Sequence, residues 1–141
     1  MSERQPDERI GGEGDNPYML RWFLFPKNRW FNIYVHKFLR SDDDRALHDH
    51  PWWFISLILR GSYIERRISA TDDNTRRTGS IALRPASTLH RIELIDNQPV
   101  WSLIITGPKC REWGFLCPQG WRHWVEFTGG PDGEMMGPGC D

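Results

Sequence analysis

The apolar residues of this chain fall into short segments that are rich in β-branched and aromatic side chains. Turn signals such as Arg60-Gly61-Ser62 and Asp96-Asn97-Gln98-Pro99 separate these segments. The pattern predicts eight strands, over residues 22–25, 31–40, 53–59, 63–69, 80–84, 88–94, 101–105 and 113–116. One short helix is expected within residues 118–127. Many short strands without a long helix indicate an all-β fold, either a sandwich or a barrel.

The two ends of the chain differ from this pattern because they are polar and rich in glycine. Residues 1–16 and 129–141 lack the apolar surface needed to offset the entropy lost on ordering. We therefore expect a flexible N-terminal tail over residues 1–16, one domain over residues 17–128 and a flexible C-terminal tail over residues 129–141.

Composition narrows the classes of partner. The 141 residues carry 18 basic and 19 acidic side chains, a net charge of −1, so no general attraction to nucleic acid or anionic membranes is expected. No apolar run approaches 18 residues and no signal-peptide pattern is present, which predicts a soluble, cytoplasmic protein. Three cysteines form no C-x-x-C motif, and we expect free thiols rather than a disulfide framework.

Histidines supply the candidate chemistry. A His-x-His sequence, His48-Asp49-His50, places both imidazoles on one face if the segment is extended, since side chains alternate along a strand. His90, from a neighbouring predicted strand, would complete a triangle of nitrogen ligands for one divalent metal ion. Three protein ligands leave coordination positions open, which is typical of a catalytic metal site.

These residues resemble the two sequence motifs of the cupin superfamily. His48, His50 and Gly61 match the first motif, and Gly79, Pro85 and His90 match the second, with Ser87 and Leu94 in place of the usual Gly and Asn. The segment 46–63 also resembles small bacterial and phage cupin-like proteins. The resemblance implies a single small cupin jelly-roll barrel over residues 17–128, with His48, His50 and His90 as metal ligands.

One motif position departs from the pattern. The glutamate ligand of the first motif falls at Phe54, so the anionic ligand is missing. Three-histidine cupins, such as thiol dioxygenases and some diketone-cleaving oxygenases, resemble this case. The alternative is a weakened site in a protein that binds a small molecule without catalysis.

Several further residues are candidates for a role near the metal. His123 is a candidate fourth ligand or acid–base group, and Arg84 is a candidate partner for a substrate carboxylate. His36 is expected either beside the metal or as a hydrogen-bonded core residue. At most one of Trp52 and Trp53 can face the metal, and the other is available for a sheet or homodimer contact.

Two basic pairs, Arg66-Arg67 and Arg76-Arg77, are interpreted as a solvated hairpin tip.

The three histidines and the missing glutamate ligand favour a metal-dependent dioxygenase acting on a small anionic or chelating molecule. Iron is the first choice of metal, with zinc, nickel, manganese and copper as other choices. A non-enzymatic sugar-like binder and a metal-dependent isomerase or lyase remain alternatives.

Overall fold

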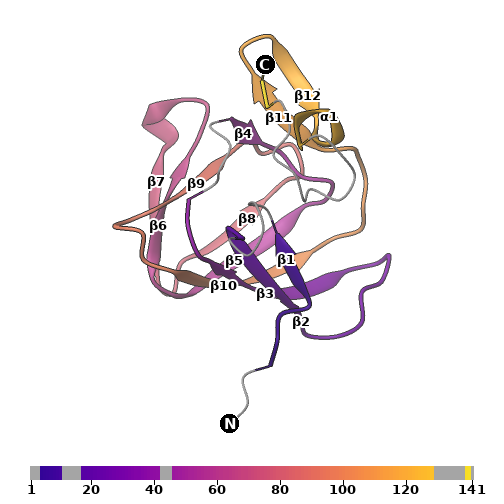
Figure 1. The fold of residues 1–141 in the computed structure, drawn as a ribbon, viewed down its shortest axis with the longest axis vertical. Helices are drawn as coiled ribbons and strands as arrows, with labels where there is room; N and C mark the ends of the chain where they lie inside the picture. The colour runs from indigo at the N-terminus through magenta and orange to yellow at the C-terminus, as the bar shows by residue number, and fades with distance from the viewer. Residues whose placement is uncertain (1–3, 11–16, 42–45, 129–138, 141) are drawn as a thin grey trace.

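The computed structural model describes residues 4–10, 17–41, 46–128 and 139–140. Nearly all regular elements in this part of the chain are strands (Figure 1). The strands are β1 (Glu8–Ile10), β2 (Met19–Phe23), β3 (Asn32–Phe38), β4 (Leu47–His48), β5 (Phe54–Arg60), β6 (Ser62–Arg66), β7 (Asn74–Arg77), β8 (Ile81–Arg84), β9 (Arg91–Leu94), β10 (Val100–Thr106), β11 (Gly114–Cys117) and β12 (Gly120–His123). A 3₁₀ turn, Ala70–Asp72, and a short helix, α1 (Trp124–Thr128), complete the fold.

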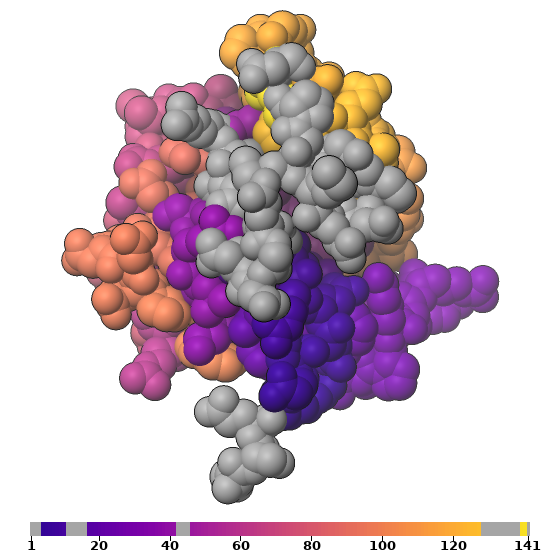
Figure 2. Space-filling view, in the orientation of Figure 1, coloured from indigo at the N-terminus to yellow at the C-terminus, as the bar shows by residue number. Residues whose placement is uncertain are grey.

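The strands form three antiparallel sheets. The largest has the order β1-β2-β3-β10-β5-β8, and two three-stranded sheets have the orders β7-β6-β9 and β12-β11-β4. The all-β class predicted from the sequence is confirmed, although none of the three sheets of the described residues closes on itself into a barrel. The β11–β12 hairpin projects at one end of the long axis (Figures 1 and 2).

Alternation along the strands creates the main core. Strand β3 buries every second residue, and the large sheet faces the β7-β6-β9 sheet. The core between them contains Met19, Phe38, Ile58, Tyr63, Ile92, Leu94 and Val100. Gly61, at the β5–β6 turn, has a φ of 95°, and a Cβ there would lie 3.0 Å from the carbonyl oxygen of Pro99. The turn therefore requires glycine at this motif position.

Four strands were not expected from the sequence: β1, β4, β7 and β12. They are two to four residues long, too short for a period-two pattern to stand out. The helix expected within residues 118–127 was wrong in its first half, since residues 120–123 form β12 and only α1 is helical. Pairing with β11 holds residues 120–123 in the extended form.

The interpretation of Arg76 as part of a solvated hairpin tip was wrong. Its side chain is buried and directed at Tyr63, its cross-strand partner. The guanidinium donates five hydrogen bonds, to the hydroxyl and carbonyl oxygens of Ser56 and of Ser80 and to the hydroxyl of Tyr63. All its donors are thus satisfied within the fold, which makes this arginine a structural residue.

Both ends of the chain have attachments that the sequence analysis did not anticipate. Residues 8–10 pair with β2, and Cys140 forms a disulfide with Cys117 of β11. The expectation of three free thiols was therefore wrong, and Cys110 is the free, exposed cysteine. Residues 1–3, 11–16, 129–138 and 141 of the predicted tails lie outside the described residues, so the proposed domain limits stay a prediction.

Candidate metal centre

Backbone pairing places two of the candidate ligands opposite each other. His48, at the end of β4, and His90, just before β9, exchange two N–H···O=C hydrogen bonds of 2.9 and 3.0 Å. Directly opposed residues in an antiparallel pair project their side chains from the same face. The amide of His50 donates to the carbonyl of Ala86 at 3.0 Å, which fixes the third histidine to the same neighbouring segment.

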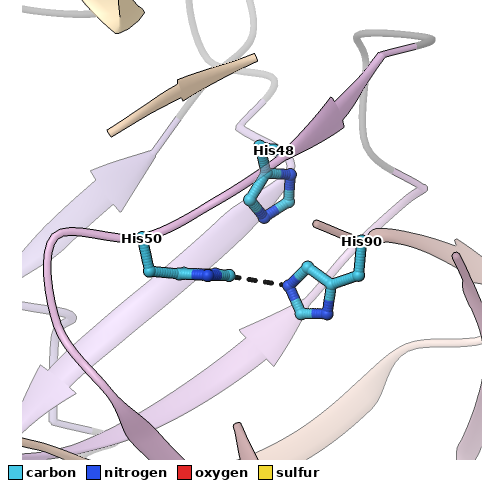
Figure 3. A group of neighbouring side chains, drawn as sticks. All are labelled: His48, His50 and His90. Carbon is cyan, nitrogen blue, oxygen red and sulfur yellow. Dashed lines mark hydrogen bonds between the residues drawn. The ribbon is translucent and has the colours of Figure 1, made fainter. Parts of the chain in front are cut away.

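The three imidazoles converge on one point (Figure 3). One nitrogen from each of His48, His50 and His90 lies within 4.8 Å of the other two. The Nε2 atoms of His50 and His90 are 3.2 Å apart. The sequence prediction that these residues come together is therefore met, and the group could hold a metal ion.

The environment keeps two of the imidazoles in the form that binds metals. Burial holds the pKa of His48 well below 6.5, and the neighbouring imidazole of His90 acts in the same direction, because two protonated rings would repel each other. Burial and the proximity of the His90 and His48 imidazoles lower the pKa of His50 in the same way, against an opposing hydrogen bond with the backbone of Thr88. Both side chains are thus neutral near pH 7, which is the ligand form of histidine. The donor set fits a divalent transition metal.

A carboxylate that the sequence analysis missed contacts the third ligand. Glu65, on β6, is almost fully buried, and its Oε2 lies 2.9 Å from Nδ1 of His90. Its Oε1 accepts a hydrogen bond of 2.7 Å from Arg84. Burial raises the pKa of Glu65, but the hydrogen bonds from His90 and Arg84 and the positive charge of Arg84 outweigh this effect and lower it to about 2. Glu65 lies two residues after Tyr63 on a predicted strand, so both side chains lie on the same face. The spacing from the aromatic Tyr63 was the sequence signal that this carboxylate is buried.

Arg84 lies close to the centre rather than on the open surface. It is the cross-strand partner of Phe54, and its guanidinium is only partly exposed. One NH₂ group is used by Glu65, whereas its buried Nε has no hydrogen-bond partner within the described part of the chain. Arg84 is thus held beside the cluster by Glu65, and its role toward a substrate carboxylate stays a prediction.

Aromatic rings form one wall of the site. The Phe54 ring lies 4.5 Å from that of His50 and 5.8 Å from that of His90, measured between centroids. Trp52 stacks on His50 at 5.6 Å, while Trp53 is exposed and covers Gly107. The site thus has an apolar wall where the first motif would carry its glutamate, and one of the two tryptophans faces the histidines, as alternation requires.

Asp49, between the two histidines of the His-x-His segment, is buried, and its side chain makes its contacts outside the cluster. It accepts hydrogen bonds from the amide of Gly114 and from Nε1 of Trp121, and it pairs with Arg111 at 2.9 Å. These contacts tie the His-x-His segment to the β11–β12 hairpin.

His123 and His36 are placed elsewhere. His123 pairs with Glu112 through Nε2 at 3.0 Å and accepts from the amide of Val125 through Nδ1. It is not part of the metal-ligand group found among the described residues, and its catalytic role stays a prediction. His36 is buried on β3 and accepts a 2.9 Å hydrogen bond from Arg21, so it is a hydrogen-bonded core residue.

Two surface grooves lie near the centre, and neither is lined by the three histidines. One, of about 300 Å³, runs between Arg67 and the segment that carries Pro85, Thr88 and Leu89. The other, of about 610 Å³, is apolar and lies over the outer face of β5 and β8. No helix in the described residues is long and apolar enough to cross a membrane.

Comparison with known proteins identifies the fold. No family model matches the sequence, and no curated protein does. Among solved structures, a protein from Ralstonia eutropha proposed to be a mannose-6-phosphate isomerase aligns with a TM-score of 0.57 at 18% identity, over 72% of this chain and 92% of its own. A Klebsiella pneumoniae protein with a double-stranded β-helix domain aligns at 0.57 and 14% identity, over 82% and 96%.

A cupin-like protein from Thermotoga maritima aligns at 0.52 and 14% identity, over 71% of this chain and 78% of its own. Sequence identities this low support a shared fold but do not indicate a shared activity. The shared architecture agrees with the order and spacing of the two histidine motifs. The chain therefore has the double-stranded β-helix fold that these solved structures share.

Proposed function

We propose that this protein is a metal-dependent cupin enzyme of the non-haem oxygenase type, with His48, His50 and His90 as its metal ligands. The observation that carries the proposal is the convergence of three imidazole nitrogens within 4.8 Å, with Phe54 in place of an anionic ligand. A divalent metal held there would supply a Lewis acid with open positions for a substrate and a co-substrate. Iron is the proposed metal, because neutral imidazole ligands suit iron and because the motifs resemble those of three-histidine dioxygenases.

The proposed substrate is a small anionic or chelating molecule. Three neutral ligands leave the charge of a divalent cation uncompensated, and the charges of Glu65 and Arg84 cancel each other. The Arg84 guanidinium is partly exposed, and its buried Nε has no partner among the described residues, so we propose that a substrate carboxylate completes its hydrogen bonds. The proposed role of Arg84 is therefore to bind the anionic group of the substrate.

Metal content is the first test. The parent protein, loaded with Fe(II) under anaerobic conditions, should retain about one equivalent after desalting. A variant with His48→Ala, His50→Ala and His90→Ala should retain none. His36→Gln is the matched control, since it changes a buried histidine outside the cluster. Equal metal content in the parent and the triple variant would overturn the assignment.

Oxygen consumption then separates the candidate functions. The Fe(II)-loaded parent is mixed with panels of small thiols and β-diketones, and dissolved oxygen is followed. Substrate-dependent consumption that the triple variant lacks supports an oxygenase. Metal binding without consumption would reject the oxygenase and favour an isomerase. One solved structure with this fold, the Ralstonia protein, has been proposed to have such an activity.

Ligand charge tests the substrate class. Calorimetry with a small dicarboxylate and with its neutral diamide should show tighter binding of the anion to the metal-loaded protein. Arg84→Ala should weaken anion binding more than it weakens metal binding. Equal or better binding of the neutral compound would instead support a sugar-like binding protein.

A further inference from the structure

Glu65 and His90 form a buried contact, and the partners of each Glu65 oxygen can be identified. Glu65 is about 1% exposed, and its two oxygens have different partners. Oε1 accepts a hydrogen bond from Arg84 at 2.7 Å, and Oε2 lies 2.9 Å from Nδ1 of His90. A second arginine, Arg67, lies 3.8 Å from the same Oε1. Two guanidinium groups beside a buried carboxylate favour its ionised form, because each would otherwise lose a charge partner.

An ionised carboxylate can accept hydrogen bonds but cannot donate one. Nδ1 of His90 must therefore carry the proton in the contact with Oε2. In a neutral imidazole one nitrogen is protonated and the other holds a lone pair, so Nε2 of His90 holds the lone pair. That Nε2 is the atom directed at the cluster, 3.2 Å from Nε2 of His50 (Figure 3).

We propose that Glu65 is a positioning residue, which fixes His90 as its Nδ1–H tautomer and so presents the Nε2 lone pair to a metal ion. The tautomer follows from the contacts of Glu65 alone, whereas its use in metal binding rests on the proposed function. The carboxylate also raises the basicity of the ring that it contacts, which strengthens the ligand. The ligand position of the first motif thus holds Phe54 in place of a glutamate, whereas Glu65 contacts Nδ1 of the ligand His90.

Nuclear magnetic resonance of the metal-free protein tests the tautomer directly. Long-range ¹H–¹⁵N correlation of ¹⁵N-histidine-labelled protein at pH 7.5 distinguishes protonated from unprotonated ring nitrogens, and the loss of signals in His90→Gln assigns the residue. We expect His90 to show a protonated Nδ1 and an unprotonated Nε2. A protonated Nε2, or an average of the two tautomers, would overturn the proposal. This measurement needs neither metal nor a Glu65 variant.

Glu65→Gln provides the second readout, because glutamine has the same shape but can both donate and accept. We expect a mixture of the two His90 tautomers in this variant, and Co(II) binding weakened roughly 10- to 100-fold. Glu93→Gln is the matched control, since Glu93 forms a similar pair with Arg66 without contacting a histidine. Its Co(II) affinity should stay within about twofold of the parent.

The two proposals fail in different ways. If the parent binds no Co(II) but His90 is the Nδ1–H tautomer, the metal function is wrong and the assignment to Glu65 stands. If the parent binds Co(II) and Glu65→Gln binds it equally well in a folded state, the positioning role is wrong and the metal site stands.

Discussion

At the scale of single residues, Phe54 decides the charge of the centre. Its ring lies against His50 and His90, at the motif position where a carboxylate ligand would be found. Phe54→Glu should tighten Co(II) binding by about tenfold or more, because it adds an anionic ligand to a neutral set. In the metal-free state the variant should be less stable, since a charge replaces a buried ring.

Titration calorimetry measures the first effect and urea unfolding the second. Phe54→Gln is the control, with a similar size and no charge. If both variants bind Co(II) equally, the gain does not come from the carboxylate and Phe54 does not face the metal position.

His36 provides a test of pH dependence. Burial, reinforced by the charge of Arg21, holds its pKa well below 6.5 in the folded protein. The unfolded chain binds a proton near pH 6.5 that the folded chain does not, so the free energy of unfolding falls as the pH drops below about 6.5. His48 and His50 act in the same direction. His36→Gln should make this dependence shallower, by up to about 1.4 kcal/mol per pH unit.

Urea unfolding of the metal-free parent and of His36→Gln between pH 5 and 7.5 gives the two slopes. Identical slopes would show that His36 is protonated equally in the folded and unfolded states, contrary to its buried contact with Arg21.

At the scale of elements, the β11–β12 hairpin depends on one buried carboxylate. Asp49 contacts the amide of Gly114, Nε1 of Trp121 and the guanidinium of Arg111. Asp49→Ala should lower the free energy of unfolding by about 2 kcal/mol, since it leaves the buried amide of Gly114 without an acceptor and removes the partner of Trp121 and Arg111. It should also speed hydrogen exchange at Gly114, because that amide loses its partner.

Asp72→Ala, at an exposed position of the 3₁₀ turn, is the control and should change stability by less than about 0.5 kcal/mol. If Asp49→Ala is no more destabilising than this control, the hairpin is held by its apolar contacts instead. Those contacts include the stacked pairs Trp113–Trp124 and Phe115–Phe127.

At the scale of the whole molecule, the disulfide joins the C-terminal end to the sheet that supports His48. Cys117 and Cys140 are 23 positions apart. Closing a loop of that length restricts the unfolded chain by roughly 3 kcal/mol. Cys140→Ser should therefore lower the free energy of unfolding by up to about 3 kcal/mol, and a reducing agent should have a similar effect on the parent.

Cys110→Ser changes the exposed free thiol and is the matched control. Guanidinium unfolding with and without dithiothreitol makes the comparison. If the parent unfolds identically under both conditions, Cys140 does not contribute to stability, and the C-terminal segment behaves as the flexible tail expected from the sequence.

Some of this protein could be determined from its sequence alone. Strand periodicity predicted the all-β class, and alternation along a strand, a local property of the backbone, placed His48 and His50 on one face. The prediction that His90 joins them rested on the resemblance to the second cupin motif. The sequence also showed that Phe54 occupies the position of the motif glutamate, because the number of residues from His50 and to Gly61 is enough to locate that position.

Only the tertiary structure decided which side chains support the cluster. Glu65 lies 25 positions from His90 in the sequence, and Cys117 and Cys140 belong to segments whose proximity no local pattern reports. Arg76 was mistaken for a solvated charge because its five acceptors come from three different parts of the fold. Local periodicity determines the face of a strand on which a residue lies, whereas sheet packing determines what that face meets. The burial of the charged residues, and with it the electrostatics of the centre, therefore depends on the assembled sheets.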